Sequence, residues 1–464
     1  MAGDVENRAV LHRGMGVVGN VLITLSGITP AVSVFVIASV AFAGQGSGAF
    51  LAFVGAGVIG VGMAMSWAEL GSMYPIAGGD YSITARVLGR FSGFLMFVLF
   101  LTLAIFIPSA IALGGANYLA PLVPGANANV VGAVIMVVVT LIAVLGIRTN
   151  AVITGVFLVI ELVLILAVVV LGLVHAHHPS LLIHPQVVSA KGALSPATIA
   201  VIGTGVTIAL FSYNGYNSSI NLSEETKGHP RDIAKAVYLA FALAIIFELT
   251  PVAAAVLGAP SLAGLATAAN PFSYLITALA GKNVNTVFSL GVFLAVINAT
   301  LAIVIINARI LYSSGRDRAW PWRISDWMAL VHPRFKSPWF ATVFIGLVGA
   351  GLTALTTVAS LVTFTAVIVA IDYVLIALCA IVSRVTQRSA ERPYRMPLWP
   401  VPPLVGLAGT VYALTQQTLH DLLIALAILV GAAIYYLLYL SRREDGWRPR
   451  QAAEPWEGAP EAAR

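Results

Sequence analysis

Twelve apolar segments follow one another along the chain, and this feature most constrains its fold. They are expected at residues 15–43, 48–74, 91–119, 129–147, 151–174, 196–222, 233–258, 285–314, 339–358, 361–383, 400–418 and 420–441. A helix needs about 20 mostly apolar residues to cross the hydrocarbon core of a bilayer. Only 9% of the 464 residues are charged, whereas soluble domains carry about 25%. The sequence therefore predicts an all-α polytopic membrane protein with about 12 transmembrane helices.

Lysine and arginine gather in every second loop between these segments. With the N-terminus in the cytoplasm, the cytoplasmic loops carry Arg86, Arg90, Arg148, Lys227, Arg231, Lys235, Arg316, Arg318, Arg323, Arg334, Lys336, Arg384, Arg388, Arg392 and Arg395, and the outer loops carry Lys191 and Lys282. Cytoplasmic loops of membrane proteins are enriched in lysine and arginine. We therefore expect a cell-membrane (inner or plasma membrane) protein with both termini in the cytoplasm. The net charge of +6 then reflects topology, and no nucleic-acid partner is expected.

The ends of the chain are polar. No short apolar region with a cleavage site follows residues 1–14, so no cleavable signal peptide is predicted. We expect a cytoplasmic segment at 1–14, a transmembrane domain at 15–441 and a disordered cytoplasmic tail at 442–464. The single cysteine, Cys379, excludes an intrachain disulfide. The histidines of the longest predicted outer loop, near 175–195, have no cysteine or carboxylate beside them, so solvated side chains are favoured over a metal site, and no cofactor is expected.

Two of the predicted helices are interrupted near their middles. Ser26-Gly27-Ile28-Thr29-Pro30 interrupts the first, and the sixth contains two Asn, three Ser and a Gly between Phe211 and Ser219. Irregular backbone survives at membrane depth only where it is buried in protein or lines a wet cavity. Interrupted helices in corresponding positions of two halves indicate the binding site of a transporter. Ordinary kinks at Gly and Pro are the alternative for either break alone.

Such breaks bind charged groups without charged side chains. A half-helix carries a partial positive charge at its N–H end and a partial negative charge at its C=O end. The candidate ligands of a carboxylate are the amides of Ser26, Gly27, Ile28 and Thr29, whereas carbonyls around Ala209, Leu210 and Phe211 would face an ammonium and Gly215 would relax the chain. Ser212, Tyr213 and Asn214 are further candidate substrate-binding residues, and Tyr213, Tyr216 and Asn217 are candidates for side-chain selectivity. Because no charged residue occurs in either break, a neutral or zwitterionic substrate is the first expectation.

Ionisable residues inside predicted spans are functional candidates, since each costs about 2.5–3.5 kcal/mol on insertion scales. Glu161, in the fifth helix, is a candidate for the coupling proton, and its alternatives are cation binding or a polar contact between helices. Asp372, in the tenth, is a candidate contact for a cationic substrate group, although a buried hydrogen bond between helices is preferred. Asn298 and Thr300, in the eighth, are candidates for an ion site near the first break or for contacts between helices.

Other carboxylates are expected to have structural roles. Glu248 precedes Pro251 in the seventh predicted helix and is expected to stabilise the proline kink. Glu69, Glu224 and Glu225 lie at membrane edges among arginines, where we expect solvated ion pairs that contribute little energy.

Several motifs resemble those of the amino acid–polyamine–organocation (APC) permeases. The run from Phe211 to Val237 resembles the sixth-helix signature of that family, and Asn307 to Tyr312 with Gly315-Arg316-Asp317 is similar to its motif at the end of the eighth helix. The runs 332–339 and 392–400 resemble its next two cytoplasmic loops, and Tyr74-Pro75 with Gly78-Gly79-Asp80-Tyr81 resembles its second-to-third loop. The resemblance extends over about residues 15–440.

This resemblance implies a fold and a class of activity. The fold is the leucine-transporter type, with two inverted five-helix repeats, about 15–174 and 196–383, and two additional helices at about 400–441. The activity is secondary active transport of an amino acid or related amine. By resemblance, the residues at the substrate carboxylate are Ser26, Gly27 and Ile28, and those that supply amine carbonyls and an outer lid are Phe211 and Ser212. Some relatives carry Lys at the position of Glu161, so this chain departs from their pattern.

We expect a transporter that works by alternating access and proton symport, as a monomer or homodimer in a lipid bilayer, with exchange as the alternative. An intramembrane aspartyl protease needs two carboxylates that share a proton. Asp80 lies in a predicted cytoplasmic loop and Asp372 at mid-span, so this arrangement is not expected and the chain is not predicted to be an enzyme. A channel is disfavoured because the sequence has no ring of repeated charges or filter carbonyls.

Overall fold

The structure is a computed structural model that describes residues 16–75, 79–119, 122–123, 125–145, 151–189, 192–223 and 226–443. Predictions that fall outside the described residues concern the segment 1–14, Gly78, Arg148, Lys191, Glu224, Glu225 and the tail from 444 onward. The proposed division into two repeats and two additional helices stays a prediction.

Each predicted apolar segment is helical in the structure. The helices at these segments are α1 (Val17–Ile28), α2 (Pro30–Val32), a π-helix η1 (Ser33–Ala38) and α3 (Ser39–Gln45), then α4 (Gly48–Met73), α6 (Arg90–Ala116), α7 (Ala128–Val144), α8 (Ala151–Val174), α10 (Ile199–Tyr213) with α11 (Ser218–Asn221), α12 (Pro230–Gly258), α15 (Lys282–Arg316), α17 (Trp339–Leu355), α18 (Val358–Thr386), α19 (Val401–Thr415) and α20 (Leu419–Leu438). Among the described residues, nine segments are long and apolar enough to cross a membrane. The other three predicted segments are the shorter apolar helices α7, α17 and α19. The all-helical polytopic fold is therefore confirmed.

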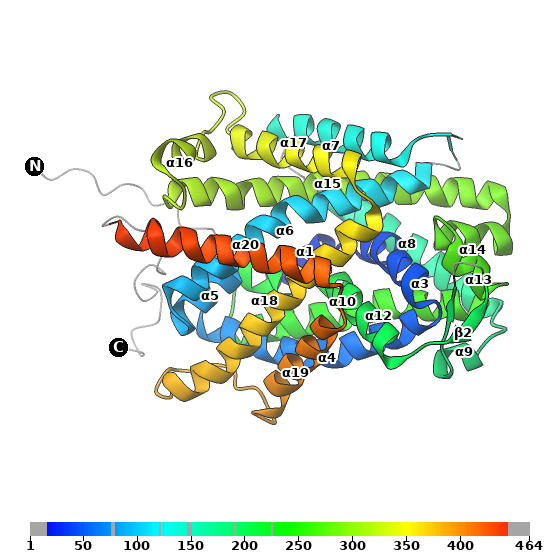
Figure 1. Cartoon of the computed structure of the whole chain (residues 1–464), viewed down its shortest axis with the longest axis horizontal. Helices are drawn as coiled ribbons and strands as arrows, with labels where there is room; N and C mark the ends of the chain where they lie inside the picture. The colour runs from blue at the N-terminus through cyan, green and yellow to red at the C-terminus, as the bar shows by residue number, and fades with distance from the viewer. Residues whose placement is uncertain are drawn as a thin grey trace, which may run out of the picture.

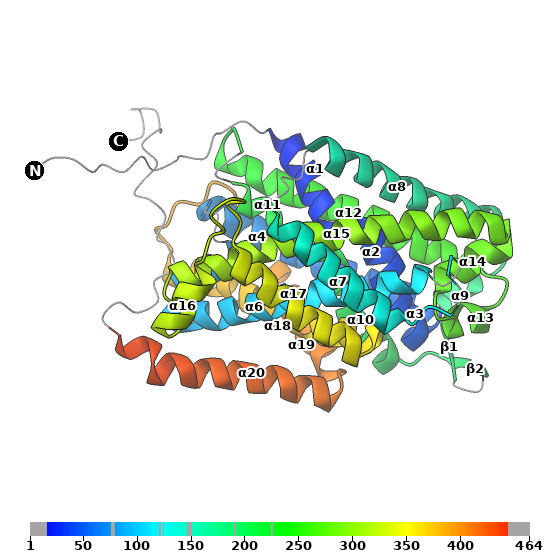
Figure 2. The same ribbon diagram turned by 90° about the horizontal axis from the view of Figure 1, so that it is seen from above.

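The helices run side by side, and the shorter elements gather at the two ends of the bundle (Figures 1 and 2). One end holds α5 (Gly79–Val87), α16 (Trp322–Met328) and the C-terminal end of α20. The other end holds α9 (Ser180–Ile183), α13 (Leu262–Thr267), α14 (Pro271–Ala280) and the antiparallel pair β1 (Gln186–Val188) and β2 (Leu194–Pro196). The first end carries most of the described arginines at helix ends, among them Arg86, Arg316 and Arg384. We call these two ends the basic end and the α13 end.

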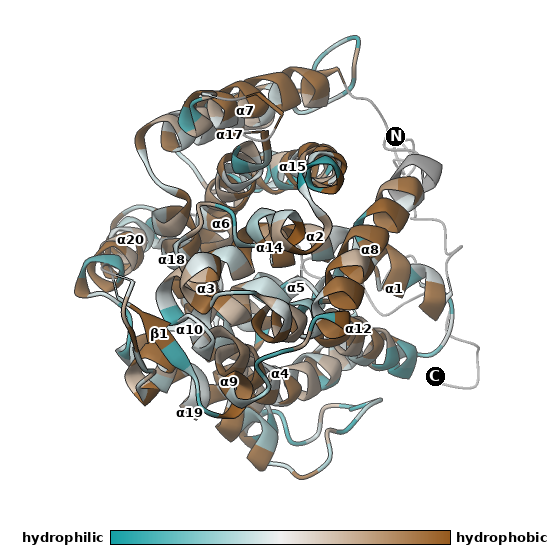
Figure 3. Cartoon of the chain, turned by 90° about the vertical axis from the view of Figure 1, so that its right-hand side faces the viewer, coloured by the Kyte–Doolittle hydropathy of each residue, from teal (hydrophilic) through white to brown (hydrophobic). Residues whose placement is uncertain are grey.

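The outer faces of the bundle are apolar. Figure 3, which looks at the bundle from the α13 end, shows hydrophobic residues around its periphery, including α7, α8 and α17. Leu141 of α7, Val163 of α8 and Leu347 of α17 are each about 60% exposed in the absence of a bilayer. Large apolar patches on a surface mark contact with protein or membrane, and a bilayer covers such faces in a polytopic protein.

Glycines let the helices that carry the site pack backbone against backbone. A Cβ at Gly172 of α8 would lie 2.3 Å from the carbonyl oxygen of Ala254 of α12, and one at Gly258 would lie 2.5 Å from the carbonyl oxygen of Gly172. Small residues allow this close approach in membrane helices. The contact fixes α8, which carries Glu161, against α12, which carries Glu248.

Candidate functional site

The first span breaks at Thr29, within the predicted stretch. Thr29 has φ 51° and ψ 72°, a left-handed conformation that β-branched residues rarely adopt. Ser26, Gly27 and Ile28 lie in the last turn of α1, where each amide donates to the carbonyl four residues before it. In this conformation the amides predicted for the substrate carboxylate are engaged within α1, and their role in binding stays a prediction.

The amide that the break frees belongs to Ala31. Pro30 has no amide hydrogen, and the two amides after Ala31 donate to the carbonyl of Thr29. Ala31 N donates across 3.3 Å to Oε2 of Glu161, whose side chain on α8 is buried. An anion is favoured where backbone N–H groups are unpaired at the start of a helical segment. Glu161 is thus the carboxyl that meets the first break.

The second break lies directly against the first. Helix α10 ends at Tyr213, Asn214 is extended, and Gly215 has φ +115°. The predicted interruption of the sixth helix is therefore confirmed. A Cβ on Gly215 would lie 3.1 Å from Cγ1 of Ile28. Because Gly215 has no side chain, the two interrupted stretches can approach closely.

Reciprocal serine contacts join the two broken helices beyond the breaks. Ser33 Oγ donates to the carbonyl oxygen of Ser212 across 2.9 Å, and Ser212 Oγ lies 3.2 Å from the carbonyl oxygen of Ser33. Ser212 Oγ also lies 2.7 Å from Oε2 of Glu248. The Ser212 hydroxyl has one proton to donate, and the shorter bond to the carboxyl oxygen of Glu248 is favoured over the bond to the carbonyl of Ser33. These contacts hold η1 and α10 together as a unit.

Glu248 is a site residue that the sequence reasoning missed. It was expected to stabilise the kink at Pro251, but its carboxyl is fully buried and is directed at Ser212. Its Oε1 has no hydrogen-bond partner among the described residues. The physical reason is that α12 packs against α10 and η1 as well as against α8, so this face of α12 meets the breaks. The signal in the sequence was limited to an ionisable residue inside an apolar span.

The remaining polar candidates of the second break differ in their surroundings. Tyr213 is fully buried, and its hydroxyl donates to the carbonyl oxygen of Phe53 across 3.2 Å. The carbonyl of Phe211 accepts the amide of Asn214 across 3.2 Å, whereas Oδ1 of Asn214 is buried without a partner among the described residues. Asn214 therefore has a free acceptor beside the break.

Asn298 and Thr300 lie on α15, which packs against α2. Thr300 is fully buried and donates to the carbonyl oxygen of Val296, and Asn298 is partly buried. In the described part of the chain, no group of three or more His, Cys, Asp and Glu residues forms a metal site. The predicted ion-binding role of these two residues stays a prediction.

Asp372 lies on the side of the breaks that faces the basic end. Its side chain is buried, and its charge interacts with that of Asp80 on α5. Between the breaks and α5, the indole of Trp67 packs edge-on against the rings of Tyr216 and Tyr373, at centroid distances of 5.3 and 4.8 Å. The expectation that Asp80 lies in a cytoplasmic loop is wrong, because Asp80 is part of the helix α5 and is only 3% exposed.

Glu69 also requires a correction. It was expected in a solvated ion pair, but it is 1% exposed. Its carboxylate accepts from Arg384 at 2.6 Å, from Arg392 at 2.9 Å and from the amide of Met396 at 2.7 Å. The loop after α18 folds back over the end of α4, and this removes the ion cluster from water at the basic end.

A cavity of about 650 Å³ opens near the α13 end. Its polar lining includes Ser39, Gln45, Asn117, Tyr118, Thr204, Asn270, Gln417, Thr418 and Asp421. Phe35, which also lines it, packs edge-on against Phe272 and Phe288, each at a centroid distance of 5.2 Å. Since Phe35 follows Ser33 by two residues, the cavity approaches the breaks from the α13 end.

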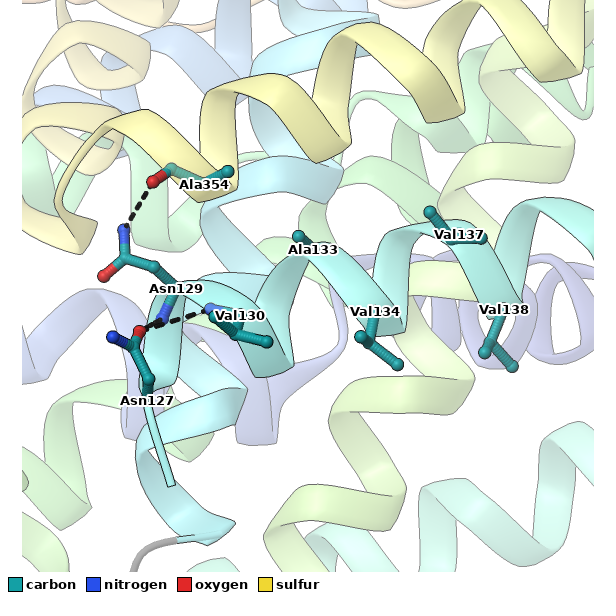
Figure 4. Close-up of a pocket in the computed structure, with 8 residues that line it drawn as sticks. All are labelled: Asn127, Asn129, Val130, Ala133, Val134, Val137, Val138 and Ala354. Carbon is teal, nitrogen blue, oxygen red and sulfur yellow. Dashed lines mark hydrogen bonds between the residues drawn. The ribbon is translucent and has the colours of Figure 1, made fainter. Parts of the chain in front are cut away.

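A second hollow, of about 420 Å³, lies away from the breaks between α7 and α17 (Figure 4). Val130, Val134 and Val137 line it with exposed apolar side chains. Its two polar residues are engaged: Asn127 caps α7, and Asn129 donates to carbonyls at the end of α17. The hollow is lined mainly by apolar side chains on the outer surface of the bundle, so it is a poor candidate for the substrate site.

Comparison with known proteins agrees with this architecture. A model of the amino acid permease family matches residues 16–438. An uncharacterized transporter of Mycobacterium tuberculosis is 30% identical over 440 residues, which cover 92% of this chain and 91% of that protein. A branched-chain amino acid permease and a methylthioribose transporter, both of Bacillus subtilis, are 23% and 25% identical; each alignment covers 89% of this chain and 91% of the relative.

Proposed function

Because this chain belongs to the amino acid permease family and is a membrane transporter, we propose that it moves an amino acid or a related amine across the cell membrane by alternating access, with proton symport. The observation that carries the proposal is the contact of two broken helices with a buried carboxyl, Glu161, hydrogen-bonded to the amide of Ala31. Transporter sites of this kind lie at the midplane between discontinuous helices.

The contact between Glu161 and Ala31 supplies a physical route to symport. A substrate carboxylate and an ionised Glu161 compete for the same partial positive charge and repel each other where the dielectric is low. Protonation of Glu161 removes that repulsion and weakens its hold on the Ala31 amide. Binding of the proton therefore favours binding of the substrate carboxylate, so the two cross together.

The amine of the substrate has acceptors on the other side of the breaks. Oε1 of Glu248 and Oδ1 of Asn214 are buried without partners among the described residues, and unpaired buried acceptors gain free energy when a donor meets them. The predicted carbonyls near Phe211 lie in the same region of α10. An α-amino acid, with an anionic and a cationic group on neighbouring atoms, fits this pairing of a freed amide with unpaired oxygens.

The distribution of charge supports an orientation. The basic end is assigned to the cytoplasm by the excess of lysine and arginine there, and the cavity of about 650 Å³ near the α13 end then faces outward. In this conformation the rings of Trp67, Tyr216 and Tyr373 pack against one another on the side of the breaks toward the basic end. Alternating access would open this aromatic layer and close the outer cavity.

Uptake into liposomes that contain the purified protein tests the proposal. Neutral and cationic amino acids, polyamines and methylthioribose are offered under separately imposed proton, sodium and counter-substrate gradients. Proton symport predicts accumulation of an amino acid or amine under a proton gradient alone, abolished by a protonophore. Accumulation driven only by internal counter-substrate indicates exchange, and uptake confined to methylthioribose would overturn the amino acid assignment.

A further inference from the structure

Two buried carboxyls, Asp80 and Asp372, lie between the second break and the basic end. Asp80 is near the start of α5, and its Oδ1 accepts from Trp67 Nε1 at 2.7 Å. Its Oδ2 accepts from Nδ2 of Asn217 at 2.6 Å, and Asn217 belongs to the second break. Asp372, on α18, is 2% exposed, and its Oδ1 has no hydrogen-bond partner among the described residues.

Within the described ranges, no cation pairs with either carboxyl of this site. Toward the basic end, the titratable and charged groups on the packed elements include Glu69 on α4, Tyr216 before α11, Tyr373, Cys379 and Arg384 on α18, Arg90 on α6, and Tyr81 and Arg86 on α5 itself. On the other elements packed against α18 they include Tyr213 of α10, Tyr412 of α19, and His420 and Asp421 of α20. Glu69 is held by Arg384 and Arg392, and both Arg86 and Arg90 are exposed. In the part of the chain that the structure describes, no ion pair involves Asp80 or Asp372.

Two interacting carboxyls in a buried site cannot both ionise, because like charges repel strongly where the dielectric is low. We propose that Asp80 and Asp372 share one proton and form a proton-binding site that holds the basic end closed. The proton is taken up when α5 packs over the second break. It leaves when the basic end opens and water reaches Asp80. This site is separate from Glu161, and its test needs no substrate.

The protonation of Asp80 determines whether acid or base favours the closed state of the basic end. Burial raises the pKa of this carboxyl to about 6, although its bonds to Trp67 and Asn217 act in the opposite direction. An open state with a solvated Asp80 has the ordinary, lower pKa, so the closed state binds the proton more tightly. The closed state is therefore favoured in acid and loses its advantage as the pH rises from about 4 to about 6.

The hydrogen bond from Asn217 connects this site to the substrate site. Asn217 follows Gly215 by two residues, and Gly215 packs against the first break. Movement of the second break on substrate binding thus changes the environment of Asp80 directly.

The single cysteine of the chain provides a native reporter. Cys379 is fully buried on α18, seven residues after Asp372, and its Sγ lies 3.7 Å from Oγ1 of Thr84 on α5. Opening at α5 exposes this thiol. The experiment measures alkylation of Cys379 by N-ethylmaleimide in purified protein between pH 4.5 and 8. Each rate is divided by the rate in the denatured chain at the same pH, which corrects for thiol ionisation.

The expected normalised rate is lowest in acid and rises at least fivefold toward neutral pH. In Asp80→Asn the rise is lost, and in Asp372→Asn it moves to lower pH by at least one unit because the repulsion is gone. Asp326→Asn, which changes an exposed carboxyl at the same end, keeps the wild-type profile. A flat wild-type profile, or unchanged profiles in both the Asp80 and Asp372 variants, overturns the proposal. If Asp80→Asn does not fold, the alkylation profile of Asp372→Asn alone tests the proposal.

Discussion

The amide nitrogen of Ala31 lies 3.3 Å from Oε2 of Glu161, so a carboxyl from the fifth span meets the break in the first. The two residues are 130 positions apart in the chain. Their contact places an ionisable group beside the Ala31 amide, which has no backbone acceptor because the helix breaks at Thr29 and Pro30. A change in the charge of Glu161 therefore acts directly on the broken helix.

Glu161→Gln tests whether this carboxyl carries the coupling proton. Glutamine keeps an oxygen that can accept from Ala31 but cannot ionise, so we expect the broken helix to be preserved and the pH dependence of uptake to be lost. The initial rate of uptake into liposomes, measured between about pH 6.5 and 8, above the range in which Asp80 titrates, should vary less than twofold in this variant. Glu391→Gln, at an exposed position, serves as the matched control. An unaltered pH response in Glu161→Gln would assign coupling to another group.

Gly215→Ala tests the contact between the two breaks. The added Cβ would lie 3.1 Å from Ile28 Cγ1 on a backbone with φ +115°, which side chains rarely adopt. We expect at least a tenfold loss of substrate affinity, measured by isothermal calorimetry or scintillation proximity, with normal membrane insertion. Gly125→Ala is the control, since Gly125 has φ +82° and a Cβ added there would meet no atom within 4 Å. Equal affinities of the Gly215 and Gly125 variants would contradict the prediction.

Gly27→Ala separates packing from substrate contact. No atom lies within 4 Å of a Cβ at Gly27, and its backbone is helical. We therefore expect thermal unfolding to be unchanged. If Gly27 approaches the substrate, as the sequence predicts, the methyl group lowers affinity without a change in stability. Retention of full affinity would remove Gly27 from the site.

The membrane spans and both breaks could be predicted from the sequence because their signals are local. Apolar length sets the spans, and clustered Gly, Pro, Asn and Ser residues interrupt two of them. The surroundings of buried carboxyls depend instead on which face of a helix meets its neighbour. Glu248 reaches Ser212 because α12 packs against α10 as well as against α8, and no local sequence pattern predicts which face of α12 does so.

Long-range contacts explain the other two errors. Glu69 is enclosed by Arg384 and Arg392, which follow it by 315 and 323 residues. The sequence predicts a loop at Asp80. The residue instead lies on the short helix α5, which packs against α18. A sequence read segment by segment places each of these carboxylates at a membrane edge, where water is the default partner.

Asp372→Asn tests the two roles considered for this residue. Asp372 is buried on α18, which packs against α5, the helix that carries Asp80, so we expect uptake of neutral and cationic substrates to change by the same factor. The ratio of their kcat/KM values, measured with the liposome panel, should stay within threefold of wild type. A loss of more than tenfold that is confined to cationic substrates would instead assign Asp372 to the substrate.

Glu69→Gln tests whether the buried ion cluster of Glu69, Arg384 and Arg392 stabilises the fold. The change leaves Arg392, whose side chain is 4% exposed, without a full counter-charge. Removing one partner of a buried ion pair costs about 3–5 kcal/mol, whereas an exposed pair contributes about 0–1 kcal/mol. Thermal unfolding in detergent should therefore show a large loss of stability for Glu69→Gln and almost none for Asp326→Asn, whose pair with Arg318 is exposed. The double variant Glu69→Gln/Arg392→Leu should recover part of the loss because the fully buried charge of Arg392 is removed, while Arg384, 21% exposed, keeps contact with water. Equal stability of Glu69→Gln and Asp326→Asn would show that water still reaches Arg392, and the stabilising role of the ion cluster would be rejected.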